Sequence, residues 1–346
     1  MTSVPRLSVG LPVYNGERYL GEAIDSLLAQ SFDDFELIIS DNASTDGTAD
    51  ICRRYARQDS RVRYIRQPQN IGLCPNHNFV AEQARGEFFK WASSDDLYGR
   101  DLLLRCVEAL DEHPEVVLAH SWNAAIDSAG TVTQAYGYPL VTDSPSAPAR
   151  LRSFLFGCSG MFEAGDGTGR RLVRLDNWGI LRACDIYGVI RTDVLRKVAP
   201  LEGYHHGDRV VEAELMLYGP FYETPDWLYF RREHEGRAYR TGLGHGRSAI
   251  RERCAILDPR RTGRFRHPTI RLVAEYLLGF AGAIRRAPLS PADRMACYRE
   301  LTGWITDRAV SSVVHRPVEP LDRYPSLANI NHAASVRFVA SGHNQA

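Results

Sequence analysis

The sequence predicts an α/β fold in which a mostly parallel sheet is flanked by helices. Short apolar segments of strand length alternate with amphipathic segments over the first 120 residues. Strands and helices that alternate in this way form parallel sheets with right-handed crossovers. Further helical patterns near the C-terminus predict a helical extension. The expected strands cover residues 7–11, 35–39, 62–66, 88–92 and 116–120.

The limits of the helices follow from apolar spacing and from turn residues. A run of Ser, Asp, Asn, Thr and Gly over residues 40–47 is typical of a loop that leads into a helix. A third helix begins near Pro75, since proline is tolerated in the first helical turn. Two more helical patterns cover residues 272–284 and 290–305. The first helix follows Gly16 and has one apolar face, made of Leu20, Ala23, Ile24, Leu27 and Leu28.

Composition excludes several classes of protein. The 42 basic and 42 acidic residues balance, so we expect no nucleic-acid partner. No apolar run approaches the roughly 20 residues that cross a bilayer, so no transmembrane segment is expected. The seven cysteines are scattered and form no CxxC pair, which is typical of a reducing compartment. The N-terminus lacks the blocks of a signal peptide. We therefore predict a cytoplasmic protein.

Two adjacent carboxylates, Asp95 and Asp96, follow directly after the expected strand at 88–92. Alone, such a pair more often caps a helix than forms a site. In a parallel sheet, however, the loops at 12–15, 41–47 and 93–98 meet at one edge, where these folds bind ligands. Tyr14 can stack on a flat ring, while the carboxylates suit a hard cation. The loops together predict a nucleotide-diphosphate site. Neither GxGxxG nor GxxxxGK[ST] occurs, so this is neither a nicotinamide nor an ATPase fingerprint.

Four motifs lie within the first 100 residues. They are Leu11-Pro12-Val13-Tyr14-Asn15-Gly16, Ser40-Asp41-Asn42-Ala43-Ser44-Thr45-Asp46-Gly47-Thr48, Asn70-Ile71-Gly72 and Ser94-Asp95-Asp96. Their order and spacing are those of family 2 glycosyltransferases, which the sequence therefore resembles over roughly residues 5–235. The resemblance implies a Rossmann-like GT-A fold, a nucleotide-diphosphate sugar donor, Mg²⁺ or Mn²⁺, and inversion of the anomeric carbon.

The resemblance also implies which residues bind the nucleotide. Asp41 and Asn42 match a pair usually written Asp-Asp, whose second member often bonds a uracil N–H. Because Asn42 departs from that pattern, the base stays open among UDP-, GDP- and dTDP-sugars. By the same resemblance, Pro12, Val13 and Tyr14 would line the base pocket, and Glu17 would reach it.

The metal and the catalytic base are implied by the same resemblance. Asp96 matches the direct metal ligand of a DXD-like motif, and Asp95 would help to position the ribose or the metal. Asp208 matches the catalytic base, a carboxylate that removes the acceptor hydroxyl's proton as the new bond forms. It could equally cap the helix that follows. Among the charged residues at 231–234, His234 is favoured to neutralise the leaving group or complete the metal shell.

We expect a catalytic domain over residues 1–240 and a mainly helical region over 241–346, on the acceptor side or at a homodimer interface. Residues 127–180 are either acceptor-binding insertions or a variable linker. The acceptor is a sugar, a lipid or a small molecule. Two rival functions stay open. A sugar nucleotidyltransferase would normally show a Gly-rich stretch and a lysine after the first strand, and a non-catalytic nucleotide-sugar-binding protein would retain the crevice without the base.

Overall fold

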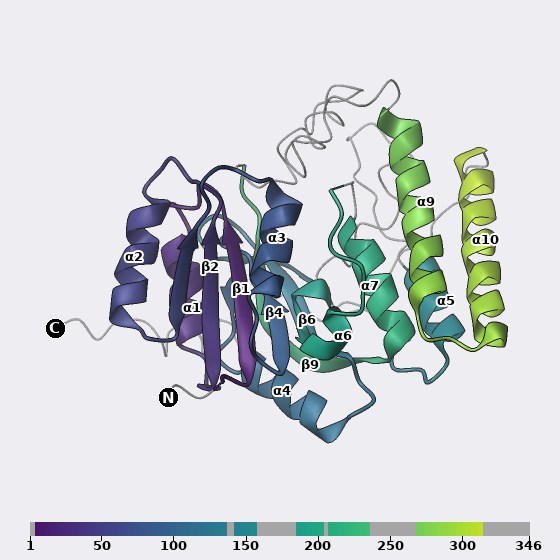
Figure 1. Ribbon diagram of the computed structural model, residues 1–346, viewed down its shortest axis with the longest axis horizontal. Coiled ribbons are helices and arrows are strands. Elements are labelled where there is room, and N and C mark those ends of the chain that lie inside the picture. The colour runs from purple at the N-terminus through teal and green to yellow at the C-terminus, as the bar shows by residue number, and fades with distance from the viewer. Residues whose placement is uncertain (1–3, 137–141, 158–184, 204–206, 236–267, 314–346) are drawn as a thin grey trace.

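The computed structural model describes residues 4–136, 142–157, 185–203, 207–235 and 268–313 (Figure 1). It confirms the predicted α/β class. A single sheet of nine strands runs through the molecule, and helices cover both of its faces.

The N-terminal half alternates strands and helices as the sequence predicts. Its four strands pair in parallel in the order β3-β2-β1-β4. The four strands predicted for this half agree with the observed ones to within two residues at each end, whereas the fifth, predicted at 116–120, is observed at Leu118–Ile126 and ends six residues later. The elements are β1 (Leu7–Val13), α1 (Leu20–Leu28), β2 (Phe35–Asp41), α2 (Thr48–Gln58), β3 (Val62–Arg66), α3 (Leu73–Glu82) and β4 (Phe88–Trp91).

The second half of the sheet mixes strand directions. Six strands of the sheet run one way, and β5, β7 and β8 run the other. The full order is β3-β2-β1-β4-β8-β6-β9-β5, with β7 beside β6. The elements are β5 (Leu97–Tyr98), α4 (Leu102–Glu112), β6 (Leu118–Ile126), β7 (Val132–Tyr136), α5 (Ala147–Gly157), the 3₁₀ turn η2 (Asp185–Tyr187), β8 (Val189–Arg191), α6 (Thr192–Leu195), α7 (Gly207–Tyr218) and β9 (Phe221–Arg232).

The two faces of the sheet bury separate apolar cores, because successive strand residues point to opposite sides. Leu37 and Ile39 of β2 belong to the core that includes α1 and α4, whereas Ile38 belongs to the core that includes α3 and α7, the helices in front of the sheet in Figure 1. Phe88 and Phe89 of β4 divide in the same way. Since both faces are covered, every residue of β1, β2 and β4 is buried.

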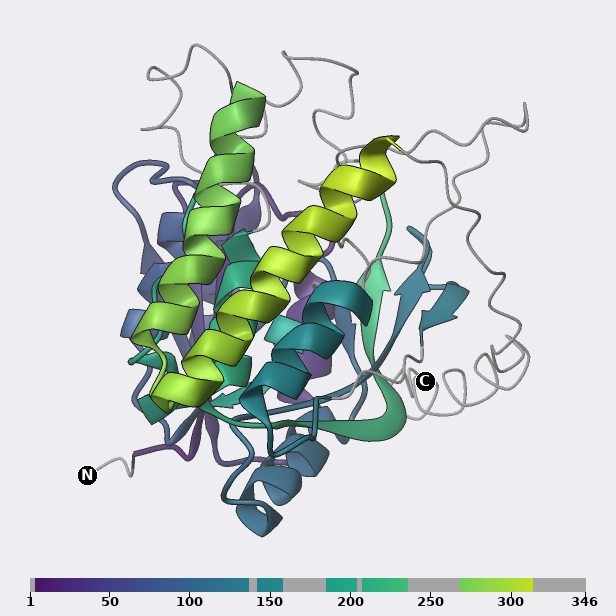
Figure 2. The same ribbon diagram turned by 90° about the vertical axis from the view of Figure 1, so that its right-hand side faces the viewer.

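Two long helices, α9 (Pro268–Arg286) and α10 (Pro291–Val313), fall in the predicted helical extension. They lie beside α5 in Figure 2 and share one core with α5 and α7, to which Tyr276, Phe280 and Trp304 contribute. The predicted domain boundary near residue 240 lies outside the described residues, so the division into domains stays a prediction. Of the segment at 127–180, the part after residue 157 also lies outside them. Within the described parts of the chain, no helix is long and apolar enough to span a membrane. The cytoplasmic location also stays a prediction.

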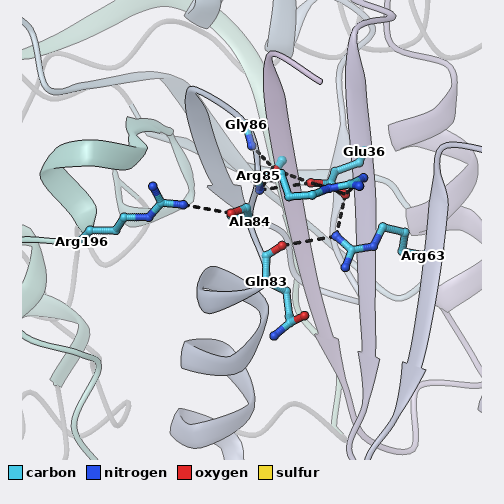
Figure 3. A network of polar contacts seen from close by, with 8 residues as sticks. Glu36, Arg63, Gln83, Ala84, Arg85, Gly86 and Arg196 are labelled. Atoms are coloured by element: carbon cyan, nitrogen blue, oxygen red, sulfur yellow. Dashed lines mark hydrogen bonds and ion pairs between the residues drawn. The ribbon is translucent and has the colours of Figure 1, made fainter. Parts of the chain in front are cut away.

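A buried carboxylate, Glu36, links four segments near the start of β2, at the sheet edge opposite the loops that follow β1 and β2 (Figure 3). Its carboxylate accepts hydrogen bonds from Ser8 Oγ at 2.8 Å, Arg63 Nη1 at 2.7 Å and Arg85 Nη2 at 2.7 Å. Burial raises the pKa of Glu36, but the combined bonds from Arg85, Arg63 and Ser8 outweigh it, so the pKa is lowered below 4.5. Nearby, Arg196 donates to the carbonyl of Ala84 at 3.1 Å.

Replacing this carboxylate should destabilise the fold in a pH-dependent way. Glu36→Gln keeps the shape but loses the charge, and we expect it to lower the free energy of unfolding by roughly 2 kcal/mol at neutral pH. Because the folded-state pKa is lowered, the difference from wild type is complete above pH 4.5 and shrinks as the pH falls through the folded-state value. Urea unfolding at a series of pH values measures it.

Glu87→Gln is the matched control. Glu87 pairs with Arg6 at 3.4 Å, and its side chain is 57% exposed. An exposed pair of this kind contributes less than about 1 kcal/mol. Equal losses in the two variants, or a loss at Glu36 that does not vary with pH, would contradict the account of this network.

Candidate active site

The loop after β1 and the loop after β2 are joined by hydrogen bonds at the sheet edge where the strands end. The Asn15 N–H donates to Ser44 Oγ, and the Gly16 N–H donates to Thr48 Oγ1, each at 2.9 Å. Tyr14, at the tip of the first loop, is 49% exposed. The structure therefore brings these two loops together as predicted, with an aromatic ring free of the core.

The predicted nucleotide-binding residues of these loops differ in exposure. Pro12 and Val13 are buried at the end of β1. Glu17 is exposed, and its carboxylate accepts the Gly47 N–H at 2.9 Å, which caps the start of α2. Asp41 is fully buried at the end of β2.

The carboxylate of Asp41 has donors on both oxygens. Oδ1 accepts the Ser44 N–H at 2.8 Å, and Oδ2 accepts the Tyr64 hydroxyl at 2.9 Å, with Arg66 Nη1 3.7 Å away. Burial, followed by the hydrogen bond to Asp41, raises the pKa of the Tyr64 hydroxyl to about 12. The hydroxyl therefore keeps its proton and donates a hydrogen bond to Asp41. Asp41 is thus held in place by these donors at the end of β2, where the two loops begin.

Asn42 clamps a third loop. Its Oδ1 accepts the Ile71 N–H at 2.8 Å, while its Nδ2 donates to Asn70 Oδ1 at 3.0 Å and to the Gly72 carbonyl at 3.2 Å. An aspartate could accept the first bond but could not donate the other two. This explains why the chain has Asn where the family pattern usually has Asp, and it links the Asn70-Ile71-Gly72 motif to the site.

The turn after β4 meets the end of β9. Asp95 Oδ2 lies 2.9 Å from His234 Nε2, although the two residues are 139 positions apart in the sequence. Their side chains are 20% and 12% exposed. Ser93 Oγ donates to the other oxygen of Asp95, and the His234 ring lies 4.8 Å from that of Tyr19. The structure therefore gathers a carboxylate and an imidazole that the sequence analysis selected separately.

Asp96 faces the interior instead. It is fully buried, and its carboxylate accepts the Tyr229 hydroxyl and, at 2.8 Å, the backbone N–H of Arg232. Its two oxygens thus have donors from within the chain, as a buried carboxylate requires. The geometry makes Asp96 a structural link between the turn and β9.

Arg232 reinforces the same link. Its Nε donates to the Asp95 carbonyl at 2.9 Å, and its Nη2 pairs with Glu22 of α1 at 2.7 Å. The side chain is 1% exposed. Arg231 pairs with Glu233 at 2.9 Å. His234, at the end of this charged run, contacts the Asp95 carboxylate.

Asp208 lies in the first turn of α7 and is half-buried. Burial raises its pKa, and the neighbouring Arg209 opposes the shift. One turn later, the fully buried Glu212 accepts the Ile186 N–H of η2 at 2.9 Å. Burial, together with the carboxylates of Asp185 and Asp208, raises the pKa of Glu212 well above its ordinary value. The base candidate therefore lies beside the turn that leads into β8, the neighbour of β4.

Several of these partners could not be found by local spacing. Tyr64, Tyr229 and Glu212 complete the site, but each reaches it through strand pairing or helix packing between distant segments. The nearest signal in the sequence is the cluster of aromatic and charged residues at 227–234, which ends β9. Within the described residues, no three His, Cys, Asp or Glu side chains gather in a way that could hold a metal by themselves.

Curated proteins are similar to part of this chain. A protein named "Putative glycosyltransferase EpsE" from Bacillus subtilis is 39% identical over 114 residues, which are 33% of this chain and 41% of that protein. Glycosyltransferase GlyG from Streptococcus pneumoniae is 30% identical over 118 residues, 34% of this chain and 39% of that protein. The chain thus matches about two fifths of the length of these curated relatives.

Solved structures show the same fold. Crystal structures of S. aureus TarS superpose with a TM-score of 0.51 for a match that covers 93% of this chain and 57% of that one. For TarS 1–349 in complex with UDP-GlcNAc, the TM-score is 0.50, and the match covers 92% of this chain and 95% of that one. Each of these two TarS structures is 16% identical in sequence to this chain. The sequence model described as "Glycosyl transferase family 2" matches residues 8–198, more than half of the chain. The chain therefore belongs to glycosyl transferase family 2.

Proposed function

We propose that the chain transfers a sugar from a nucleotide-diphosphate sugar to an acceptor hydroxyl, with inversion at the anomeric carbon and assistance from Mg²⁺ or Mn²⁺. The observation that carries this proposal is the 2.9 Å contact between Asp95 and His234 beside the loops that end β1 and β2. Membership of the family supports the class of reaction.

The loops after β1 and β2 would bind the nucleotide. Tyr14 is exposed at the tip of its loop, where its ring can stack on the base. Pro12 and Val13 would form the wall beneath it. The buried Asp41 lies at the end of β2, where its carboxylate would bind a base or ribose hydroxyl. Glu17 would stay at the rim of this pocket.

Asp95 and His234, in place of Asp96, would hold the metal. Asp96 is buried and its oxygens are engaged by Tyr229 and Arg232, whereas the other two side chains are partly exposed and adjacent. One carboxylate and one imidazole fit a cation that takes its remaining ligands from water and the donor's phosphates, as Mg²⁺ and Mn²⁺ do in phosphate sites. When bound, the ion would supply positive charge to the leaving diphosphate.

Asp208 would act as the general base. A sugar hydroxyl has too high a pKa to attack unaided, and a carboxylate within hydrogen-bond reach removes its proton as the new bond forms. Burial raises the pKa of Asp208 toward the working pH, which strengthens it as a base. The acceptor would be a sugar, a lipid or a small molecule that presents this hydroxyl.

The metal proposal predicts different outcomes for the two adjacent aspartates. Nucleotide diphosphate release from a panel of UDP-, GDP- and dTDP-sugars, measured against Mn²⁺ concentration, is the assay. Asp95→Asn and His234→Ala should each raise the half-saturating Mn²⁺ concentration by about tenfold or more, because each removes a ligand. Asp96→Asn should instead lower the melting temperature, because a buried acceptor is lost.

Glu233→Gln is the control for surface charge beside the site, since Glu233 pairs with Arg231. It should leave the Mn²⁺ dependence unchanged. If Asp96→Asn alone shifts that dependence while Asp95→Asn does not, the metal assignment is wrong. A chain that binds a nucleotide sugar with a thermal shift but releases no nucleotide diphosphate would be a binding protein, and the enzymatic proposal would fail.

The base proposal predicts a selective loss of transfer. Asp208→Asn should lower the rate of transfer to the acceptor by roughly a hundredfold or more, while nucleotide-sugar binding, followed by calorimetry, stays close to wild type. Asp193→Asn, which changes an exposed aspartate in the first turn of α6, is the matched control and should stay active. A fully active Asp208→Asn variant would overturn the base assignment.

The same residue predicts the acidic limb of the pH profile. Asp208 must be ionised to accept a proton, and burial raises its pKa above the ordinary 3.8. The rate should therefore fall as the pH drops through this raised value, at a higher pH than an ordinary aspartate would give. Rates at saturating Mn²⁺ test this, so that protonation of His234 does not limit metal binding. No decline before pH 3.8 would contradict the prediction.

A further inference from the structure

A lysine lies buried directly before the Ser93–Asp96 turn. Lys90 occupies the third position of β4, and its side chain is fully buried. Lysine is rarely found in such a position, because taking an ammonium group out of water is costly. Such a group needs compensating contacts, and their identity indicates what it does.

The ammonium group is enclosed by aromatic rings. Lys90 Nζ lies 5.2 Å from the ring centre of Tyr98 and 5.7 Å from that of Tyr229, both within the range of cation–π attraction. These two rings are stacked on each other with centres 5.8 Å apart. Nζ also donates a hydrogen bond to the carbonyl of Tyr187.

The two tyrosines whose rings contact the ammonium group both form hydrogen bonds with the Ser93–Asp96 turn. The Tyr98 hydroxyl accepts the Ser93 N–H at 2.7 Å and lies 3.0 Å from the Ser93 carbonyl. The Tyr229 hydroxyl donates to Asp96. Lys90 thus contacts the rings whose polar ends fix the start and the end of this turn.

Through the carbonyl of Tyr187, the same ammonium group also contacts η2, the turn that packs against the helix of the proposed base. Tyr187 ends η2, and the preceding residue, Ile186, donates its N–H to Glu212, one turn after Asp208. The side chain of Lys90 therefore touches both the segment that carries Asp95 and the segment that packs against the base helix α7.

We propose that Lys90 is a positioning residue that sets the Ser93–Asp96 turn relative to η2, and with it the donor side of the site relative to the acceptor side. The inference rests on the proposed glycosyl transfer and adds to it a residue outside the ligand-binding loops. Lys90 acts through Tyr98, Tyr229 and the Tyr187 carbonyl.

A purely structural role fits these contacts less well. Burial lowers the pKa of Lys90 to about 8, with Asp96 among the groups that oppose the shift, so the ammonium is mostly charged at neutral pH and is held there at a cost. Apolar residues of similar volume often replace buried charges without loss of stability. A charge that does not favour folding, yet contacts both sides of a catalytic site, indicates a role in that site.

The test is Lys90→Met in the full chain, with nucleotide diphosphate release in the presence of Mn²⁺ as the assay and thermal unfolding alongside. The melting temperature should stay equal to wild type or rise. The value of kcat should fall by about tenfold or more, because a small misplacement of reacting groups is costly, while KM for the donor changes less. Lys197→Met, at an exposed lysine in the turn after α6, is the control and should match wild type.

A double-mutant cycle separates positioning from general destabilisation. Tyr98→Phe removes one of the groups through which Lys90 acts, so Lys90→Met should cost less in that background than in wild type. Lys90→Gln, a neutral polar variant, replaces Lys90→Met if the latter does not fold, with the same expected loss of kcat.

Three outcomes are decisive. If wild type releases no nucleotide diphosphate, the proposed function fails and this inference fails with it. If wild type is active and Lys90→Met is equally active, the positioning role alone is overturned. If Lys90→Met loses stability and activity in parallel, and its effect is additive with Tyr98→Phe, Lys90 is structural and the inference is overturned as well.

Discussion

The buried carboxylate of Asp96 is the contact on which the rest of the site depends. A carboxylate that is fully removed from water must find donors, and here both come from β9, at Tyr229 and at the Arg232 N–H. Because those residues lie more than 130 positions later in the chain, the contact joins the early parallel half of the sheet to its last strand. It also fixes the direction of the neighbouring side chain. With Asp96 turned inward, Asp95 points outward to His234.

The order of the strands explains why the two sides of the reaction can meet. β4 lies between β1, which carries the Tyr14 loop, and β8, which follows η2. One short strand thus has the strand that carries the Tyr14 loop on one side and the segment that contacts α7 on the other. The helices α9 and α10 complete the core behind α5 and α7, so the predicted helical extension supports the base helix by direct packing.

Local patterns were enough to predict the parallel half of the fold, because apolar spacing and turn residues act within a few positions. β5 and β8 could not be predicted in this way, since strands of two and three residues have no period to detect. The same limit applies to the acid pair. The resemblance to family 2 pointed to Asp95, Asp96 and His234, but which carboxylate is buried is decided by β9 pairing with β5 and β6. Likewise, the sequence showed that Asn42 departs from the usual Asp, and the contacts with Asn70 and Gly72 supply the reason.

The central claim is that Asp95 and His234 face the donor while Asp96 supports them from within. The most direct measurement is a crystal structure with Mn²⁺ and the nucleoside diphosphate that gives the largest thermal shift, with the metal located by its anomalous scattering. The account predicts a peak within coordination distance of the Asp95 carboxylate and His234 Nε2, with Asp96 still bonded to Tyr229. A peak coordinated by Asp96, or a bound nucleotide diphosphate with Mn²⁺ elsewhere, would contradict it.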